Sequence, residues 1–193
     1  MGATTTLCPP TSYGLDTEGV ITVRLARQGE DDDRITELRA EKLGRAFGHQ
    51  QFVPEPLDVE RDRAGFVFCA EQNGELVASI RALPYETGLS GVADQVPSHC
   101  ETAYLDASCL EVSRFVARRA SDGLAAGLLL LREAARWTLE NTKYRRLYAL
   151  APVSLVTYYT RLGMTVAPDD VWREGCAISR RFVSGDLSVV ARR

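Results

Sequence analysis

A strand, a glycine-containing turn, a long helix and a second strand follow one another directly in the second half of the chain. Residues 109–117 alternate between apolar and polar side chains, which is typical of a strand. The apolar positions from Leu124 to Leu139 recur at helical spacing, and residues 147–150 form a short apolar strand. This succession of strand, helix and strand indicates a parallel crossover within one sheet.

The first half of the chain carries the signature of an antiparallel hairpin. Residues 65–72 and 75–83 are predicted strands, and the Asn73-Gly74 dipeptide between them is a strong signal for a tight turn. Alternation predicts a further strand at residues 20–28. Together the two halves predict an α/β (or α+β) fold: a central mixed sheet, antiparallel in its N-terminal half and flanked by helices.

Helices and loops are predicted around these strands. Three aspartates at residues 31–33 precede apolar residues at helical spacing, and acidic residues favour a helix start through the macrodipole. Residues 49–63, with two prolines, are expected to form a loop, as is the long stretch 84–107. A last strand is predicted at residues 175–183.

The length of 193 residues is that of one domain. We expect a flexible N-terminal arm at residues 1–19, where Thr, Pro, Ser and Gly occur without periodicity, a single domain at residues 20–185 and a C-terminal tail at residues 186–193.

Composition narrows the class of protein. A net charge of −3 argues against general nucleic-acid binding, and no apolar run is long enough to span a membrane. The five cysteines contain no C-x-x-C pair, so we expect reduced thiols in a cytoplasmic protein. No pattern of metal ligands stands out, and no metal is predicted.

The turn between residues 118 and 125 opens the long helix. Free backbone N–H groups at a helix N-terminus form an anion site that suits a phosphate. The alternative is a plain strand–helix connection without a ligand.

A second motif follows the next strand. Ser154 can cap a helix, and the segment Tyr158-Tyr159-Thr-Arg-Leu-Gly-Met164 ends it with Gly163 at the left-handed cap position. With the preceding strand and phosphate-type turn, this segment resembles the GNAT (N-acetyltransferase-like) superfamily. The resemblance implies a sheet that splays between its fourth and fifth strands, with Tyr159 beside a thioester sulfur as proton donor to the leaving thiolate. Alternatively, Tyr159 is a core or surface tyrosine.

A narrower resemblance spans residues 34–164. Its elements are Leu38-Arg39, the pair Asp58 and Asp62, the run from Gly74 to Arg81 and the segment Glu111-Val-Ser-Arg114-Phe. This set is similar to the acyl-homoserine lactone (AHL) synthases and the N-acyl amino acid synthases. It implies transfer of an acyl group from a pantetheine thioester to an amine. The donor would be an acyl carrier protein or acyl-coenzyme A, with no tightly bound cofactor.

Roles in acyl transfer follow from this resemblance and from the chemistry of the residues. Glu111 is the candidate general base, acting through water; alternatively it is an ion-pair partner of Arg114 or Arg81. Glu111 and Arg114 are three residues apart, so they face opposite sides of a strand unless a bulge intervenes. The backbone N–H groups of Phe115, Val116 and Ala117 would hold the thioester oxygen.

The donor and acceptor sides also have candidate residues. Gly123 and Ala125 fit the usual phosphate loop, but Ala120 replaces its first Gln or Arg, and this reduced loop favours a carrier protein over coenzyme A. Arg118 and Arg119 would pair with the acidic face of a carrier, or else lie in a solvated turn. The candidate acceptor-binding residues are Arg39, Asp58, Asp62, Arg81 and Arg114, with aspartate for an ammonium group and arginine for a carboxylate.

The favoured hypothesis is an N-acyltransferase that moves an acyl group from a carrier-protein thioester to a small-molecule amine in natural-product or signal biosynthesis. One alternative is an N-acetyltransferase that uses acetyl-coenzyme A. The other is a non-catalytic GNAT-like module that binds an acyl ligand or a protein. The pairing of Glu111 with Tyr159 favours catalysis.

Overall fold

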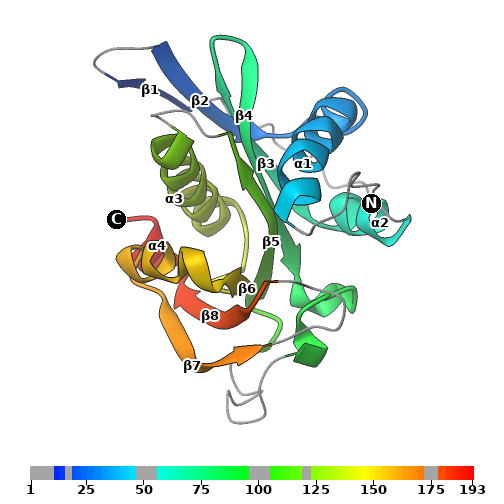
Figure 1. The fold of residues 1–193 in the computed structure, drawn as a ribbon, viewed down its shortest axis with the longest axis vertical. Coiled ribbons are helices and arrows are strands. Elements are labelled where there is room, and N and C mark those ends of the chain that lie inside the picture. The colour runs from blue at the N-terminus through cyan, green and yellow to red at the C-terminus, as the bar shows by residue number, and fades with distance from the viewer. Residues whose placement is uncertain (1–10, 16–18, 47–55, 96–104, 119–122, 172–177) are drawn as a thin grey trace.

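The computed structural model describes residues 11–15, 19–46, 56–95, 105–118, 123–171 and 178–193. Its centre is an eight-stranded sheet in the order β1-β2-β3-β4-β5-β6-β8-β7 (Figure 1). Among the described strands only the β5–β6 pair is parallel, which confirms the predicted mixed sheet with an antiparallel N-terminal half. The strands are β1 (Thr11–Leu15), β2 (Gly19–Leu25), β3 (Phe66–Gln72), β4 (Glu75–Pro84), β5 (Cys109–Ala117), β6 (Arg146–Pro152), β7 (Thr165–Val171) and β8 (Arg180–Asp186).

Helices cover both faces of the sheet. Helices α1 and α2 lie on one face, and α3, α4 and α5 lie on the other (Figure 1). The largest apolar core fills the space between the sheet and α3, and a smaller core lies beneath α1. The helices are α1 (Asp32–Ala46), α2 (Pro56–Ala64), α3 (Gly123–Asn141), α4 (Val156–Arg161) and α5 (Leu187–Val190), with 3-10 turns η1 (Tyr85–Thr87), η2 (Ala93–Gln95) and η4 (Val153–Leu155).

The β3–β4 hairpin confirms the turn predicted from its dipeptide. Gln72 pairs with Glu75, so only two residues connect the strands. Asn73 and Gly74 have φ angles of 53° and 81°, which is the left-handed pair that a type I′ turn requires. This tight turn fixes the register of β4, and β4 in turn aligns β5.

The sheet opens between β5 and β6. These are the fourth and fifth of the predicted strands, between which the resemblance implied a splay. Pairing is limited to residues 109–111 of β5 with residues 146–148 of β6. Beyond Glu111 the two strands share no bridge, although β5 continues to Ala117 and β6 to Pro152. One edge of residues 112–117 is therefore not covered by the neighbouring strand.

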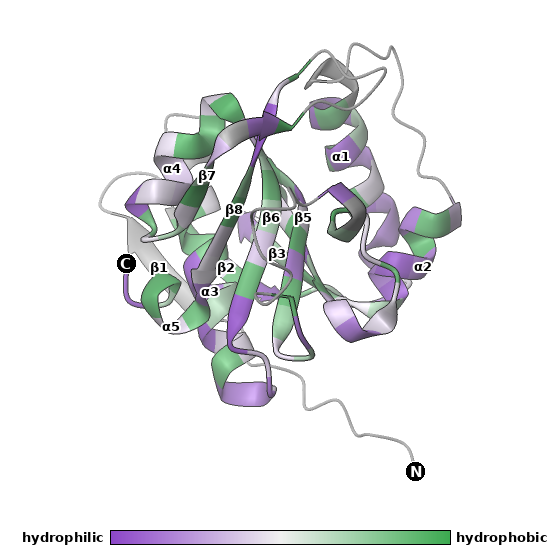
Figure 2. Ribbon diagram, turned by 90° about the horizontal axis from the view of Figure 1, so that it is seen from below, coloured by the Kyte–Doolittle hydropathy of each residue, from purple (hydrophilic) through white to green (hydrophobic). Residues whose placement is uncertain are grey.

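Two elements differ from the sequence-based expectation. Helix α2 occupies part of the expected loop 49–63, and Figure 2 shows it as largely hydrophilic. Its apolar residues have no helical periodicity, so the pattern gave no signal. Strand β7 was not predicted, because Pro168 and two aspartates interrupt its alternation.

Parts of the expected N-terminal arm and C-terminal tail have regular secondary structure. Residues 11–15 of the expected arm pair with β2 as an edge strand. In the expected tail, Leu187 and Val190 of α5 are buried in the core against α3, and the Asp186 carboxylate caps α5 by accepting from the Ser188 N–H. Apolar burial therefore holds this segment. The division into one domain stays a prediction.

Candidate active site

A bulge in β5 determines which face its polar side chains occupy. Ser113 pairs with Arg81 and Val116 pairs with Ser79, so Arg114 and Phe115 together lie opposite one residue of β4. Arg114 has a φ angle of 53°, a left-handed conformation that is unusual for a residue with a side chain. The bulge brings the Arg114 side chain to the α1–α2 face, on which residue 81 also lies.

The five candidate acceptor residues lie together in one ion-pair cluster. Arg114 contacts both carboxylate oxygens of Asp58 at 2.7 Å. Arg81 lies between the two aspartates, with its Nη1 3.3 Å from Asp58 Oδ1 and 3.4 Å from Asp62 Oδ1. Arg39 from α1 donates two bonds to Asp62. Four elements that are distant in sequence thus meet at this point: α1, α2, β4 and β5.

Charge and burial together keep this cluster ionised. It contains three arginines and two aspartates, and Arg81 is only 2% exposed. Burial alone would raise the pKa of Asp58, but the attraction of Arg114 and Arg81 outweighs it, and the pKa is lowered. Asp58 is therefore a carboxylate already engaged by arginine, whereas the half-buried Arg114 lies nearer to solvent.

Glu111 lies on the same face of the sheet and is 1% exposed. Its Oε2 atom accepts hydrogen bonds from the Ser90 hydroxyl at 2.7 Å and from the Gly91 N–H at 2.8 Å. The Tyr148 hydroxyl donates to Ser90 at 3.1 Å, which extends the chain of hydrogen bonds. Burial is the main reason that the pKa of Tyr148 is raised, so this hydroxyl stays protonated as a donor. The carboxylate of Glu111 is thereby fixed in position.

Ser90 and Tyr148 were not identified from the sequence. Ser90 lies within the long stretch 84–107, which has no motif, and Tyr148 lies in a strand expected only to be apolar. Their contact with Glu111 depends on the pairing of β5 with β6 and on how the chain returns after β4. No local signal marks either residue.

The open edge of β5 carries the predicted oxyanion groups. The Arg118 N–H donates to Val77 O at 2.8 Å, toward β4. Successive N–H groups of a strand alternate between its two edges, so the N–H of Ala117 faces the open edge. By the same alternation the N–H of Val116, which pairs with Ser79, faces β4, and Phe115 belongs to the bulge. Of the three predicted oxyanion residues, the structure therefore turns the N–H of Ala117 to the open edge, and its role stays a prediction.

Both tyrosines of the predicted motif are buried on α4, which packs on the α3 face. The rings of Tyr158 and Tyr159 meet edge to face with centroids 5.7 Å apart. Burial raises the pKa of both hydroxyls, so both keep their protons near neutral pH. Gly163 ends the helix with a φ angle of 81°, which confirms the left-handed cap, although Ser154 lies within η4 and does not cap α4.

The donor-side residues are only partly described. Helix α3 begins at Gly123, with Ala125 in its first turn, which confirms that the turn leads into a helix N-terminus. Arg118 lies between two carboxylates, 3.6 Å from Glu41 and 3.5 Å from Glu75. Arg119 and Ala120 lie outside the described residues. Within the described segments, no three His, Cys, Asp or Glu side chains are placed to hold a metal ion.

Comparisons with known proteins find similarity at the level of structure. No protein-family model matches the sequence, and no curated protein matches it. The solved AHL synthase LasI is 18% identical with a TM-score of 0.65, covering 88% of this chain and 91% of that one. FeeM, an N-acyl amino acid synthase from uncultured soil microbes, is 12% identical with a TM-score of 0.68, covering 93% of each chain.

A third solved structure, the GNAT domain of S. lividans PAT, is 19% identical with a TM-score of 0.58 and covers 92% of this chain and 96% of that one. These similarities confirm the predicted GNAT-like fold. No helix among the described residues is long and apolar enough to cross a membrane.

Proposed function

We propose that this protein is an N-acyltransferase that moves an acyl group from a pantetheine thioester to the amine of a small molecule. The observation that carries the proposal is the open edge of β5, which lies next to a bulge; Glu111 is on one face of the sheet, and α4, which carries Tyr159, packs on the other. Solved neighbours with the same fold are named as synthases of acyl-homoserine lactones and N-acyl amino acids. A role in natural-product or signal biosynthesis fits both names.

The proposed reaction has one nucleophilic substitution at the thioester carbon. Glu111 accepts a proton from the acceptor ammonium group through water, and the neutral amine attacks the carbonyl carbon. The N–H of Ala117, next to the bulge at Phe115, stabilises the negative oxygen as the C–N bond forms. When the C–S bond breaks, Tyr159 donates its proton to the thiolate. The former amine nitrogen loses its extra proton, which returns through water to the Tyr159 phenolate, and the products are an amide and a free thiol.

The acceptor is proposed to carry a carboxylate next to its amine. The cluster of Arg39, Asp58, Asp62, Arg81 and Arg114 contains three guanidinium groups, and guanidinium groups bind carboxylates through paired hydrogen bonds. Arg114 would bind that carboxylate, since the Asp58 side chain already holds the guanidinium in place at 2.7 Å. The aspartates then position the arginines and do not themselves bind the ammonium group.

Thiol release tests the proposal. The protein is mixed with acyl carrier protein or acyl-coenzyme A and with candidate amino acids, and free thiol is followed over time. We expect release that depends on the amine and falls about 10²–10⁴-fold in Tyr159→Phe, because the thiolate then leaves without its proton. Binding of donor without turnover for any amine would instead support a non-catalytic module.

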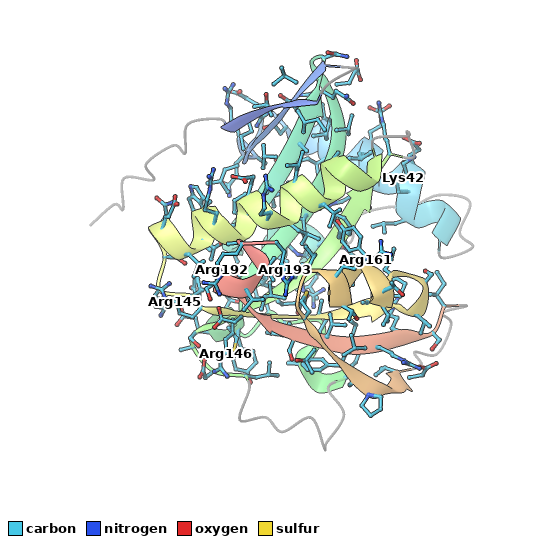
Figure 3. All side chains as sticks on the ribbon, turned by 90° about the vertical axis from the view of Figure 1, so that its left-hand side faces the viewer. Lys42, Arg145, Arg146, Arg161, Arg192 and Arg193 are labelled. Carbon is cyan, nitrogen blue, oxygen red and sulfur yellow. The ribbon has the colours of Figure 1, made fainter. Side chains whose placement is uncertain are left out.

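A basic surface formed by Arg161 and Arg193 supports a carrier protein as donor. Both side chains are exposed, and Figure 3 labels both on the side of the molecule that carries α4. Arg193 Nε is 3.9 Å from the position that a Cβ on Gly163 would take, which places it at the end of α4. Such a surface would attract the acidic face that carrier proteins usually show. Coenzyme A, which presents no protein face, is the alternative donor.

Charge reversal at this surface separates the two donors. We expect Arg161→Glu combined with Arg193→Glu to raise the KM for acyl carrier protein about tenfold at low salt, because the variant repels an acidic partner. The KM for acyl-coenzyme A is expected to stay unchanged. Arg63→Glu, on α2 at the opposite face, is the matched control. A variant that uses the carrier as well as the native protein would contradict docking at this surface.

A further inference from the structure

The hydroxyl of Tyr158 is a buried polar group without a hydrogen-bond partner in the described part of the molecule. Tyr158 is 8% exposed, and burial raises the pKa of its hydroxyl, which therefore keeps its proton. Phenylalanine would fill the same apolar space without the cost of burying an unpaired hydroxyl. Buried hydroxyls are normally paired, so this exception calls for a partner that the free chain does not supply.

The surroundings of this hydroxyl place it beside the proposed donor route. The Tyr158 ring stacks on Phe115 with centroids 5.9 Å apart, and Phe115 belongs to the bulge at the open edge of β5. A Cβ on Gly127 of α3 would lie 3.2 Å from the Tyr158 hydroxyl and 2.9 Å from Phe115 Cζ. The hydroxyl thus reaches the second turn of α3 only because residue 127 has no side chain.

A pantetheine arm would pass through this region. Its phosphate would bind at the N-terminus of α3, and its thioester would lie at the open edge of β5. The Tyr158 hydroxyl lies between these two points, since it contacts α3 at Gly127 and the bulge at Phe115. The arm carries two amide carbonyls and ends in a thioester carbonyl, and each is a hydrogen-bond acceptor. The half-buried Phe115 ring lies over the Tyr158 ring and separates it from the open edge.

We propose that Tyr158 binds the acyl donor by donating a hydrogen bond from its hydroxyl to a carbonyl oxygen of the thioester or of its arm. This inference rests on the proposed acyl transfer and assigns Tyr158 a role distinct from that of Tyr159. Tyr158 holds the donor, whereas Tyr159 protonates the leaving thiolate. Loss of the Tyr158 hydroxyl therefore weakens binding, and loss of the Tyr159 hydroxyl slows turnover.

Calorimetric titration of Tyr158→Phe with coenzyme A and with octanoyl-coenzyme A tests the proposal. We expect the Kd to rise roughly three- to tenfold, which is the range for loss of one neutral hydrogen bond. An equal rise for both ligands places the acceptor in the arm, and a rise for octanoyl-coenzyme A alone places it in the thioester. Without ligand, the Tm of the variant should equal or exceed that of the native protein.

A second tyrosine provides the control. The Tyr144 hydroxyl donates to Glu86 at 2.8 Å, and Tyr144 precedes the end of β6 that pairs with β5, away from the open edge. Tyr144→Phe should therefore lower the Tm and leave both Kd values unchanged. If Tyr158→Phe binds both ligands as the native protein does, the hydroxyl has no donor contact and the inference is overturned, while acyl transfer by the native protein still supports the proposed function. If the native protein binds neither ligand nor a carrier thioester, both proposals fail.

Discussion

Glu111→Gln is expected to lower kcat/KM for the acceptor amine by roughly 10²–10⁴-fold at neutral pH, because the amide cannot accept a proton. The substitution keeps the shape of the side chain, so its contacts with Ser90 and Gly91 change little in geometry. The KM for the acyl donor should stay the same, since Glu111 lies on the acceptor side of the sheet. The measurement is amine-dependent thiol release at saturating donor.

The pH profile separates a base from a residue with only a structural role. A rising pH supplies more neutral amine directly, so the deficit of Glu111→Gln should shrink as the pH approaches the pKa of the amine. Ser90→Ala serves as the positioning control: it removes the 2.7 Å bond that orients the carboxylate and should reduce kcat less than Glu111→Gln does. Full activity of a folded Glu111→Gln variant at neutral pH would rule out the proposed base.

Asp58→Asn is expected to lower the free energy of unfolding by about 3–5 kcal/mol, the usual cost of removing one partner from a buried ion pair. Arg81 is buried and would keep only Asp62, at 3.4 Å, as a counter-charge in the cluster. Arg114 would lose the carboxylate that fixes it at the bulge. Urea unfolding at neutral pH measures the change. Glu60→Gln, exposed on the same helix, should change stability by less than about 0.5 kcal/mol.

Acid should reproduce this loss in the native protein. Because the pKa of Asp58 is lower in the folded state, its contribution to stability is complete above the unfolded pKa of about 3.9 and is lost as the pH falls through the folded value. The stability of Asp58→Asn should therefore fall less steeply below pH 4. An equal acid dependence in both proteins would show that the charge of Asp58 does not stabilise the fold.

Local chemistry made part of this molecule predictable. Asn73-Gly74 specifies its turn through two backbone conformations that few other residues adopt, and the spacing before Gly163 identifies the end of α4. Glu111 and Arg114 are three residues apart, so the sequence predicted that they lie on opposite faces unless a bulge intervenes. The bulge is present, and it brings Arg114 to the face that α2 covers. Each of these signals lies within a few residues of the chain.

Helix α2 was unpredictable because its stability comes from distant residues. Its sequence has no apolar face, and Asp58 is held by Arg81 and Arg114 from strands that follow later in the chain. The bond from Ser90 to Glu111 likewise joins residues 21 positions apart. Whether a buried hydroxyl such as that of Tyr158 has a hydrogen-bond partner likewise depends on residues that the fold brings around it. Long-range pairing, not local preference, determines these features.

The pairing between β5 and β6 is short, and it divides the sheet into two parts. Strands β1–β5 form one antiparallel ribbon and β6–β8 form another, and three residue pairs join them. Helix α3 packs against β2, β3, β4 and β5 of the first ribbon. It also packs against α5, which follows the second ribbon, so it spans the junction between the two ribbons. Since backbone pairing joins the two ribbons at residues 109–111 and 146–148, the apolar core beneath α3, which contains residues of both ribbons, supplies much of the remaining contact between them.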